Sequence, residues 1–166
     1  MPKVYLSIGT NIGDRLSNLQ MAINHLKAHY SILAVSKVYE TQPVGEVVQE
    51  DFYNLVVALQ IPDTSTPEDL LTQTQAIEKV MKRVKTVHWG PRTIDLDILL
   101  FDDVKLVTDV LKIPHPEMAN RLFVLQPLLE VAQVICDQPV INSTTQLLAD
   151  TLDQNWVRPI HSSISY

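Results

Sequence analysis

The chain has 166 residues, of which 46% are hydrophobic and 19% charged, so we expect one globular domain over residues 1–166 with a proper core. The formal net charge of −6 argues against a general affinity for nucleic acid or anionic membranes, and no apolar run approaches the ~18 residues that span a bilayer. Cys136 is the only cysteine, which excludes an internal disulfide, and we expect a cytoplasmic monomer.

Apolar periodicity predicts the elements of the first half of the chain. In order these are a strand at 4–8, a helix at 15–29, a strand at 32–39, a polar loop at 42–51, a strand at 52–61 and a helix from 66 to about 81. Gly9 and Gly13 are expected to allow a tight turn into the first helix. Thr66 and Pro67 are typical of a capped start of the second helix.

The second half is predicted on the same grounds. Its elements are a basic loop at 82–92, a strand at 93–101, a hairpin partner at 104–107, a short helix or turn at 124–129, a last helix at 144–152, an edge strand at 156–160 and a loose tail after 161. Ser143 is expected to open a capping box for the last helix. The order β-α-β, β-α-β favours an α+β fold of the ferredoxin-like, split βαβ type, with a mainly antiparallel sheet and helices packed on it.

Asp95 and Asp97 alternate with apolar residues in the strand at 93–101. Because successive side chains of a strand point to opposite faces, both carboxylates project from one face. The alternative is the solvated face of an edge strand, but Asp is a poor strand former and the residues that follow are apolar enough to be buried. Carboxylate oxygens without a nearby cysteine predict a hard ion, Mg²⁺ before Zn²⁺, which is usually held by one or two carboxylates plus substrate phosphates.

Four basic residues lie just upstream although the chain is acidic overall, namely Lys82, Arg83, Lys85 and Arg92. Basic side chains beside a magnesium site favour a polyphosphate ligand. The sequence contains neither G-x-x-x-x-G-K-[ST] nor G-x-G-x-x-G, so a nucleotide would be held by side chains more than by a glycine-rich loop. The pattern predicts phosphoryl-type transfer from a nucleotide.

Three further features of the sequence are each open to two interpretations. Asn54 follows Phe52 and Tyr53 at the start of a strand, where it is either a turn residue or an amide that meets a planar heterocycle beside the rings. Trp89 either anchors the core or covers an adenine. His115 is held between two prolines near a chain reversal, where either a structural or a ligand-binding role is expected.

Five motifs in order resemble one family, the 6-hydroxymethyl-7,8-dihydropterin pyrophosphokinases of folate biosynthesis. They are G-T-N-I-G-D-R at 9–15, the spaced set Ser36, Tyr39, Thr41, Pro43 and Gly45, F-Y-N at 52–54, W-G-P-R-T-I-D-L-D-I at 89–98, and the P-H-P…M-x-x-R-x-F-V-L-x-P-L pattern at 114–128. The resemblance runs from residue 4 to about 132. It implies magnesium-dependent transfer of diphosphate from ATP to the hydroxymethyl group of 6-hydroxymethyl-7,8-dihydropterin, with AMP as the other product.

The resemblance also implies a role for each matching residue. Two Mg²⁺ ions are expected on Asp95 and Asp97. The residues expected at ATP are Gln75, Glu78, Trp89, Arg92, Ile98, His115 and Arg121. Those expected at the pterin are Thr41, Val44, Phe52, Asn54, Asp95 and Phe123, with the ring between Phe52 and Phe123. Those expected to be catalytic are Arg83, Arg92, Asp95 and Asp97. Loops at 42–51 and 82–88 are expected to close over the substrates.

Two departures and two rivals stay open. The basic loop looks about one residue shorter than in some relatives, so either Arg83 or Lys85 takes the catalytic-loop role, and Glu117 stands where many relatives carry Arg. One rival is a ferredoxin-like binding module without chemistry, which would have no use for Asp95 and Asp97 beside four basic residues. The other is a nucleotidyltransferase or phosphohydrolase with the same metal chemistry, which would not need a site for a planar acceptor.

Overall fold

The computed structural model describes residues 1–42, 50–84 and 94–166, apart from the side chains of Arg83 and Val84. Its elements, in chain order, are β1 (Lys3–Thr10), α1 (Arg15–Lys27), β2 (Ser31–Val35), β3 (Tyr39–Thr41), β4 (Phe52–Gln60), α2 (Pro67–Val84), β5 (Asp95–Phe101), β6 (Leu106–Val107), β7 (Lys112–Ile113), η1 (Met118–Asn120), α3 (Leu122–Val134), α4 (Gln138–Asp150) and β8 (Val157–Pro159).

The main sheet has the strand order β5-β1-β4-β3-β8, and β2 pairs with β4 beside β3. Every strand pair in it is antiparallel, and β1 pairs with β4 along its whole length, from Lys3 opposite Gln60 to Thr10 opposite Tyr53. A separate hairpin joins β6 to β7. The predicted α+β fold with a mainly antiparallel sheet and packed helices is therefore confirmed.

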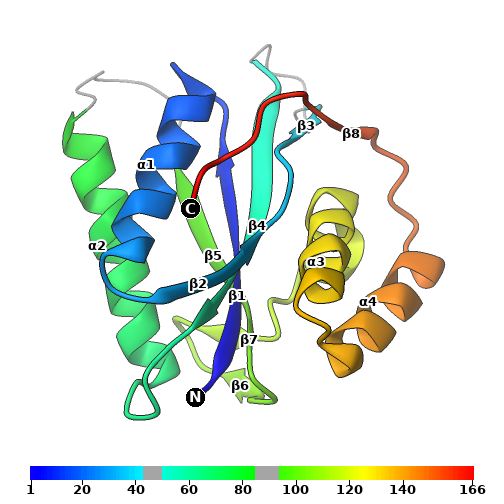
Figure 1. The fold of residues 1–166 in the computed structure, drawn as a ribbon. Helices are drawn as coiled ribbons and strands as arrows, with labels where there is room; N and C mark the ends of the chain where they lie inside the picture. Colours follow the sequence, from blue (N-terminus) through cyan, green and yellow to red (C-terminus); the bar gives the residue numbers. More distant parts are fainter. Residues whose placement is uncertain (43–49, 85–93) are drawn as a thin grey trace.

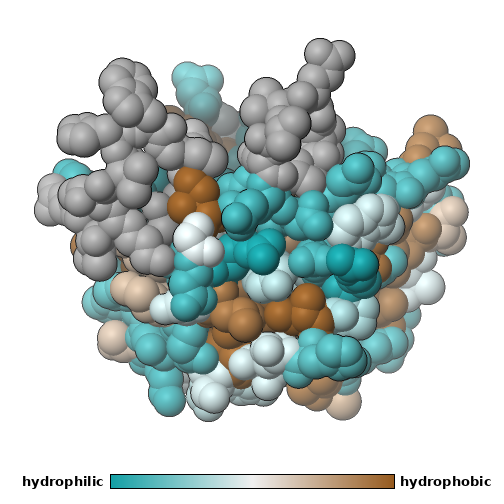
Figure 2. Space-filling model, turned by 90° about the horizontal axis from the view of Figure 1, so that it is seen from above, coloured by the Kyte–Doolittle hydropathy of each residue, from teal (hydrophilic) through white to brown (hydrophobic). Residues whose placement is uncertain are grey.

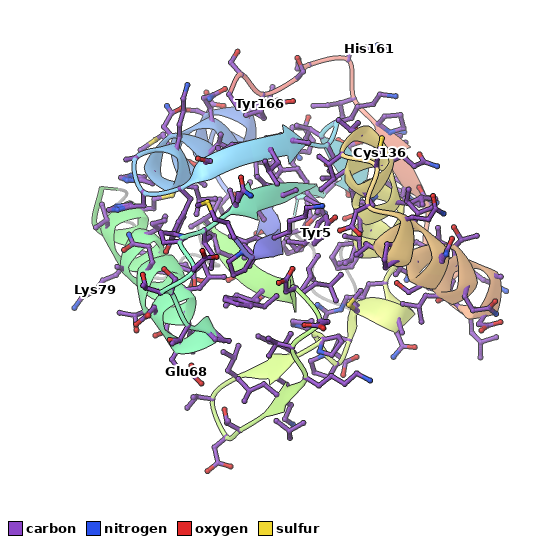
Figure 3. The ribbon with its side chains drawn as sticks, turned by 60° about the horizontal axis from the view of Figure 1, so that its bottom comes forward. Tyr5, Glu68, Lys79, Cys136, His161 and Tyr166 are labelled. Atoms are coloured by element: carbon purple, nitrogen blue, oxygen red, sulfur yellow. The ribbon has the colours of Figure 1, made fainter. Side chains whose placement is uncertain are left out.

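The helices cover both faces of the sheet, α1 and α2 on one face and α3 and α4 on the other (Figure 1). Alternation along β1 supplies both cores, because Leu6 and Ile8 are buried on the α1/α2 face and Tyr5 is buried on the α3/α4 face. Tyr5 lies near the centre of the molecule (Figure 3), and its hydroxyl donates to Asp137 Oδ2 at 2.7 Å. This bond satisfies the one polar atom that Tyr5 carries into the core.

The predicted start of the second helix is confirmed in atomic detail. Thr66 Oγ1 accepts a hydrogen bond from Asp69 N at 3.1 Å, and Thr66 N donates to Asp69 Oδ2 at 2.9 Å. Two backbone donors that the helix cannot use are thereby satisfied. The helix α2 extends to Val84, so Lys82, which was expected in the basic loop, belongs to the helix.

Four boundaries differ from the sequence-based expectations. The strand expected at 32–39 is two strands, β2 and β3, which both pair with β4. The segment expected to pair as a hairpin with β5 pairs instead with β7. The short helix expected at 124–129 is the longer α3, which continues through Pro127 because both its flanks pack on the sheet and α4. The last helix begins at Gln138 with a proline in its first turn, so Ser143 lies inside it and opens no capping box.

The tail expected to be loose is held against α1. Ile164 is buried in the core, and Ser165 exchanges two hydrogen bonds with the Gln20 side chain, at 2.8 and 3.0 Å. Within the described ranges, none of the helices combines the length and the apolar character that crossing a membrane requires.

Candidate active site

The site lies at the end of the sheet where β1 ends and β4 and β5 begin. Gly9 is the residue that joins the two strands, because it lies opposite Asp95 on one side and opposite Asn54 on the other. Next to them, Thr41 of β3 lies opposite Phe52. Seen from this end, hydrophilic side chains cover much of the described surface, with apolar side chains beside them (Figure 2). Strand pairing thus brings residues from four strands to one place.

A cavity of about 520 Å³ opens at this end of the sheet, on the α3/α4 face. Its volume is in the range of small-molecule sites. It is lined by Ser7, Gly9, Thr41, Gln42, Phe52, Asn54, Asp95, Asp97, Glu117, Asn120, Arg121, Phe123, Asp153 and Asn155. The lining thus includes two aromatic rings, a buried amide and two carboxylates of one strand, which together suit a polar, planar ligand.

Asp95 and Asp97 both line this cavity, as the alternation along the strand predicts. The Asp95 side chain is half-buried and Asp97 is exposed, while Leu96 and Ile98 between and after them are buried on the opposite face. Two carboxylates that line one cavity fit Mg²⁺, because this ion keeps several of its coordination positions for water and phosphate oxygens. Among the residues that are described, no group of three or more His, Cys, Asp or Glu side chains gathers around one point.

Asn54 is buried at the floor of the cavity, and its Nδ2 donates to Thr41 Oγ1 at 2.9 Å. A Cβ atom at Gly9 would come within 2.6 Å of Asn54 Oδ1, so only glycine leaves room for this amide. The sequence-based assignment of Gly9 to the turn before α1 is therefore wrong. Gly13 does lie in that turn, with φ 66°, which is a left-handed conformation that suits glycine.

Two cavity residues come from the start of α3. Arg121 is the N-cap residue of the helix and Phe123 follows in the first turn. The guanidinium carbon of Arg121 lies 5.7 Å from the centre of the Phe123 ring, at the outer range of a cation–π contact. Both side chains line the cavity together with Phe52. The two phenylalanines that the resemblance pairs around the pterin therefore line the same cavity and come from different elements.

A second cavity, of about 240 Å³, lies next to the first. It is lined by Leu71, Leu96, Asp97, Ile98, Thr108, Asp109, Val110, Leu111, Lys112, His115 and Pro116. Asp97 lines both cavities, and it is the residue at which they meet. Ile98 and His115, which the resemblance assigns to ATP, lie on the second cavity only.

His115 is held by backbone contacts on both sides. Its backbone N donates to Leu99 O at 3.0 Å, and its Nδ1 accepts from Glu117 N at 3.1 Å. Burial lowers the pKa of the imidazole, the nearby Asp97 carboxylate opposes this, and the positive charge of Arg121 lowers it further. A neutral ring that accepts at Nδ1 carries its proton on Nε2.

Gln75 and Glu78 lie on α2, on a third, more open surface that they share with Lys79 and Lys82. Glu78 Oε1 accepts a hydrogen bond from Leu96 N at 3.2 Å, on the free edge of β5. Burial raises the pKa of the Glu78 carboxyl, although this hydrogen bond and Lys82, 3.8 Å away, act in the opposite direction. Glu78 therefore supports the strand that carries the two aspartates, and is not a simply solvated residue.

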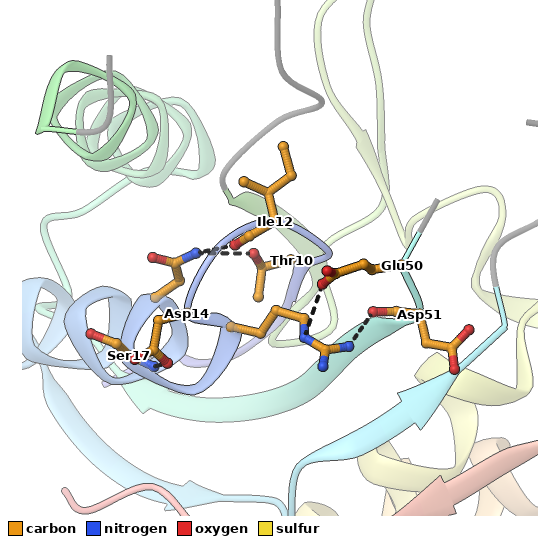
Figure 4. Close-up of polar contacts among 8 residues, drawn as sticks. Thr10, Ile12, Asp14, Ser17, Glu50 and Asp51 are labelled. Atoms are coloured by element: carbon orange, nitrogen blue, oxygen red, sulfur yellow. Dashed lines mark hydrogen bonds and ion pairs between the residues drawn. The ribbon is translucent and has the colours of Figure 1, made fainter. Parts of the chain in front are cut away.

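Arg15 is a residue of the first motif for which sequence reasoning gave no role. Its Nη1 donates to Asp51 O at 2.7 Å, its Nε lies 3.8 Å from Glu50 Oε2, and its guanidinium carbon lies 3.9 Å from the centre of the Tyr53 ring. Figure 4 draws the contacts to Glu50 and Asp51 beside the N-cap of α1. Arg15 thus holds the first residues of β4 from the α1 side, while Phe52 faces the cavity on the other side.

Five residues with expected roles fall outside this description: Val44, Lys85, Trp89, Arg92 and the side chain of Arg83. The loops expected at 42–51 and 82–88 also lie largely outside the described residues. Conversely, sequence reasoning assigned no ligand role to several residues that line the first cavity, namely Ser7, Asn120, Asp153 and Asn155. Ser7 had a signal in the sequence, because it alternates with Gly9 on the face of β1 that meets the aspartates.

Two neighbouring cavities meet at the Asp-x-Asp strand, and one of them carries two phenylalanine rings and a buried amide. This arrangement fits a transferase that joins a planar acceptor to a phosphate donor. A family model described as 7,8-dihydro-6-hydroxymethylpterin-pyrophosphokinase matches residues 5–133. The 2-amino-4-hydroxy-6-hydroxymethyldihydropteridine pyrophosphokinase of Bacillus subtilis is 43% identical over 144 residues, which cover 86% of this chain and 85% of that protein.

Longer proteins contain a similar region. The bifunctional protein FolKE of Lactococcus lactis subsp. lactis is 46% identical over 133 residues, which cover 79% of this chain and 38% of that protein. A crystal structure of Plasmodium falciparum HPPK-DHPS has a TM-score of 0.60 at 18% identity, over 75% of this chain and 37% of that one, and shows a similar fold.

The chain belongs to the 7,8-dihydro-6-hydroxymethylpterin-pyrophosphokinase family. It is an ATP-dependent diphosphotransferase of folate biosynthesis that acts on the hydroxymethyldihydropterin. The two rival functions considered from the sequence, a binding module and a nucleotidyltransferase or hydrolase, are thereby set aside.

Proposed function

We propose that the larger cavity binds the pterin, that the smaller one binds the nucleotide, and that transfer takes place where they meet at Asp97. The observation that supports this most directly is that Asp97 lines both cavities. A group that reaches two substrates at once is suited to align them, and alignment is a large part of catalysis of phosphoryl transfer.

The pterin ring is proposed to lie between Phe52 and Phe123, because both rings line the larger cavity and flat heterocycles stack on aromatic faces. Asn54 and Thr41 form a hydrogen-bonded pair on the cavity wall and are proposed to bind the polar edge of the ring. Val44 is proposed to complete this edge. Asp95, which is half-buried beside Gly9, is proposed to lie near the hydroxymethyl group.

ATP is proposed to extend from the smaller cavity toward Asp97, with Ile98 beside the nucleotide and His115 and Arg121 near the phosphates. Gln75, Glu78, Trp89 and Arg92 are proposed to contribute from the α2 side. The positive charge of Arg121 and the Nε2–H of a neutral His115 both suit phosphate oxygens. Either Arg83 or Lys85 is proposed to take the catalytic-loop role.

Asp95 and Asp97 are proposed to hold two Mg²⁺ ions. When bound, Mg²⁺ would neutralise charge on the polyphosphate and lower the pKa of the attacking hydroxyl. In the reaction, the hydroxymethyl oxygen loses its proton to solvent and bonds to the β-phosphorus, the bond from that phosphorus to the oxygen shared with the α-phosphorus breaks, and AMP leaves with that oxygen. The chain's own contribution is to position the two substrates in line and to place cationic side chains around the phosphates.

We also propose that the chain acts as a cytoplasmic monomer of one domain, without nucleic acid. The net charge of −6 disfavours binding to polyanions.

The test is to incubate the chain with ATP, Mg²⁺ and 6-hydroxymethyl-7,8-dihydropterin and to quantify AMP with and without the pterin. Pterin-dependent AMP that matches an equal amount of diphosphorylated pterin is expected. Release of inorganic phosphate without AMP, or AMP formation that ignores the pterin, would contradict the proposed reaction.

A further inference from the structure

The segment that follows α4 forms part of the wall of the larger cavity, although it lies beyond Gln133, where the family match ends. It runs beside α3 on its way from α4 to β8 (Figure 1). Asp153 and Asn155 of this segment line the cavity together with Phe52 and Phe123. Neither residue is among those assigned to the pterin, to ATP or to the metal ions.

The Asp153 carboxylate is held in place by three hydrogen bonds. Its Oδ2 accepts from Leu122 N at 2.8 Å, and its Oδ1 accepts from Asn155 N at 3.0 Å and from Asn155 Nδ2 at 2.8 Å. Partial burial tends to raise the pKa of this carboxyl, but the hydrogen bonds outweigh it and hold the pKa below its usual value. Asp153 is thus a charged acceptor directed at the first N–H of α3.

The first turn of α3 has little support of its own. The first four N–H groups of a helix have no partner within the helix, and Arg121, the N-cap residue, makes no side-chain capping bond. Pro127 lies four residues after Phe123, so the Phe123 carbonyl also lacks the hydrogen bond that a helix normally supplies. The cap therefore comes from Asp153, which is remote in the sequence, and a negative charge there also suits the positive end of the helix dipole.

We propose that Asp153 is a positioning residue for the pterin site, which holds the first turn of α3 and thereby keeps Arg121 and Phe123 on the cavity wall. The proposal rests on the assignment of the larger cavity to the pterin. Leu122, the residue that Asp153 binds, stands between these two side chains in the sequence. A displaced first turn would move both of them. The lining of the smaller cavity would stay in place, because no residue of α3 lines it, so ATP would lose only the contribution of Arg121 while the pterin would lose its stacking ring.

The test compares Asp153→Ala with Asp153→Asn, which keeps an acceptor oxygen, and with Asp150→Ala as a control. Asp150 is an acidic residue at the end of α4 that accepts a hydrogen bond from Gln146 and does not line the cavity. Binding of the pterin and of a non-hydrolysable ATP analogue is measured separately by calorimetry, and kcat and KM for each substrate are determined.

Asp153→Ala is expected to weaken pterin binding about fivefold to tenfold, with a matching rise in the pterin KM, and to weaken binding of the ATP analogue by a clearly smaller factor, because only Arg121 of the displaced turn is proposed to reach the phosphates. Asp153→Asn, which keeps one acceptor oxygen but loses the charge and the second acceptor, is expected to have an intermediate effect, and Asp150→Ala is expected to stay near the parent protein. Unchanged pterin binding in Asp153→Ala, or equal weakening of both ligands, would overturn the proposal. If Asp153→Ala does not fold, Asp153→Glu, which shifts the acceptor without removing it, is tested with the same expectation.

Phe123→Ala distinguishes a failure of the cavity assignment from a failure of the positioning role of Asp153. If this variant binds the pterin as the parent does, the assignment of the cavity fails. If Phe123→Ala weakens pterin binding and Asp153→Ala does not, the cavity assignment holds and only the positioning role of Asp153 fails.

Discussion

The two faces of the sheet carry different kinds of side chain although the same strands supply both. On the α1/α2 face, Ile8, Leu96 and Ile98 are buried in a continuous core. On the α3/α4 face, the apolar core includes Tyr5 and Leu128 but gives way to the cavity at the end where α3 begins. The difference teaches that the larger cavity is the part of the α3/α4 face that the start of α3 leaves uncovered.

The largest effect that would break this comparison is expected at Asp97. Asp97→Ala should lower kcat at least about 10³-fold, because several kcal/mol of charge stabilisation in the transition state depend on the metal that Asp97 is proposed to hold. Circular dichroism and the thermal unfolding midpoint should match the parent, since the side chain is exposed. Near-parental turnover at saturating Mg²⁺ would contradict the metal assignment.

The next largest effect is expected on the opposite face. Ile8→Ala should lower the free energy of unfolding by about 2–5 kcal/mol, because it leaves a cavity in a fully buried core. At a temperature where the variant is folded, pterin affinity should be close to that of the parent. Urea unfolding measures the first quantity and calorimetry the second, and a selective loss of pterin binding would show that the two faces are not independent.

Phe123→Ala sharpens the comparison within the α3/α4 face. Loss of one stacking ring should weaken pterin binding about tenfold to a hundredfold and leave binding of an ATP analogue nearly unchanged. Phe123→Tyr keeps the ring and serves as the matched variant, with near-parental binding. Equal losses for both ligands in Phe123→Ala would argue against a pterin sandwich.

A smaller effect is expected at Arg15, which acts from the other face. Arg15→Ala removes the contacts that hold residues 50–53, so Phe52 should be less well positioned and pterin binding should fall about threefold. Gln20→Ala, on the same helix but in contact with Ser165, is the control. If both variants weaken pterin binding equally, the effect belongs to α1 as a whole and not to Arg15.

The smallest effect concerns the pH dependence of stability. Because the pKa of His115 is lowered in the folded protein, the unfolded state binds its proton first as the pH falls. The contribution of the neutral ring is fully present above the unfolded pKa of about 6.5 and is lost as the pH falls through that value toward the folded pKa. Unfolding followed from pH 7.5 to 5.5 should show a shallower decline in His115→Gln than in the parent, and identical slopes would contradict this.

Local signals were enough for much of the fold and for part of the site. The alternation of Asp95, Leu96 and Asp97 predicts which side chains share a face, and the capping box at Thr66 predicts a helix start, because both effects act over a few residues. Ser143 shows the limit of such signals. The same type of pattern lies inside α4, because the helix starts earlier, with Pro139 in its first turn and with Val140, Leu147 and Leu148 packed against the core of the α3/α4 face.

The features that could not be predicted depend on contacts between distant residues. Gly9 looks like a turn residue in the sequence, and its need for space arises only because Asn54 lies opposite it in the sheet. Asp153 carries no motif, and its role follows from reaching Leu122 across the fold. Ile164 likewise becomes a core residue only through tertiary packing.

The most direct test of the central assignment is a crystal structure of the chain with Mg²⁺, 6-hydroxymethyl-7,8-dihydropterin and a non-hydrolysable ATP analogue. We predict that the pterin lies between Phe52 and Phe123 and that the nucleotide lies beside Ile98 and His115. The ions are predicted on Asp95 and Asp97, between the two substrates. A pterin outside the larger cavity, or metal ions away from the two aspartates, would contradict this prediction.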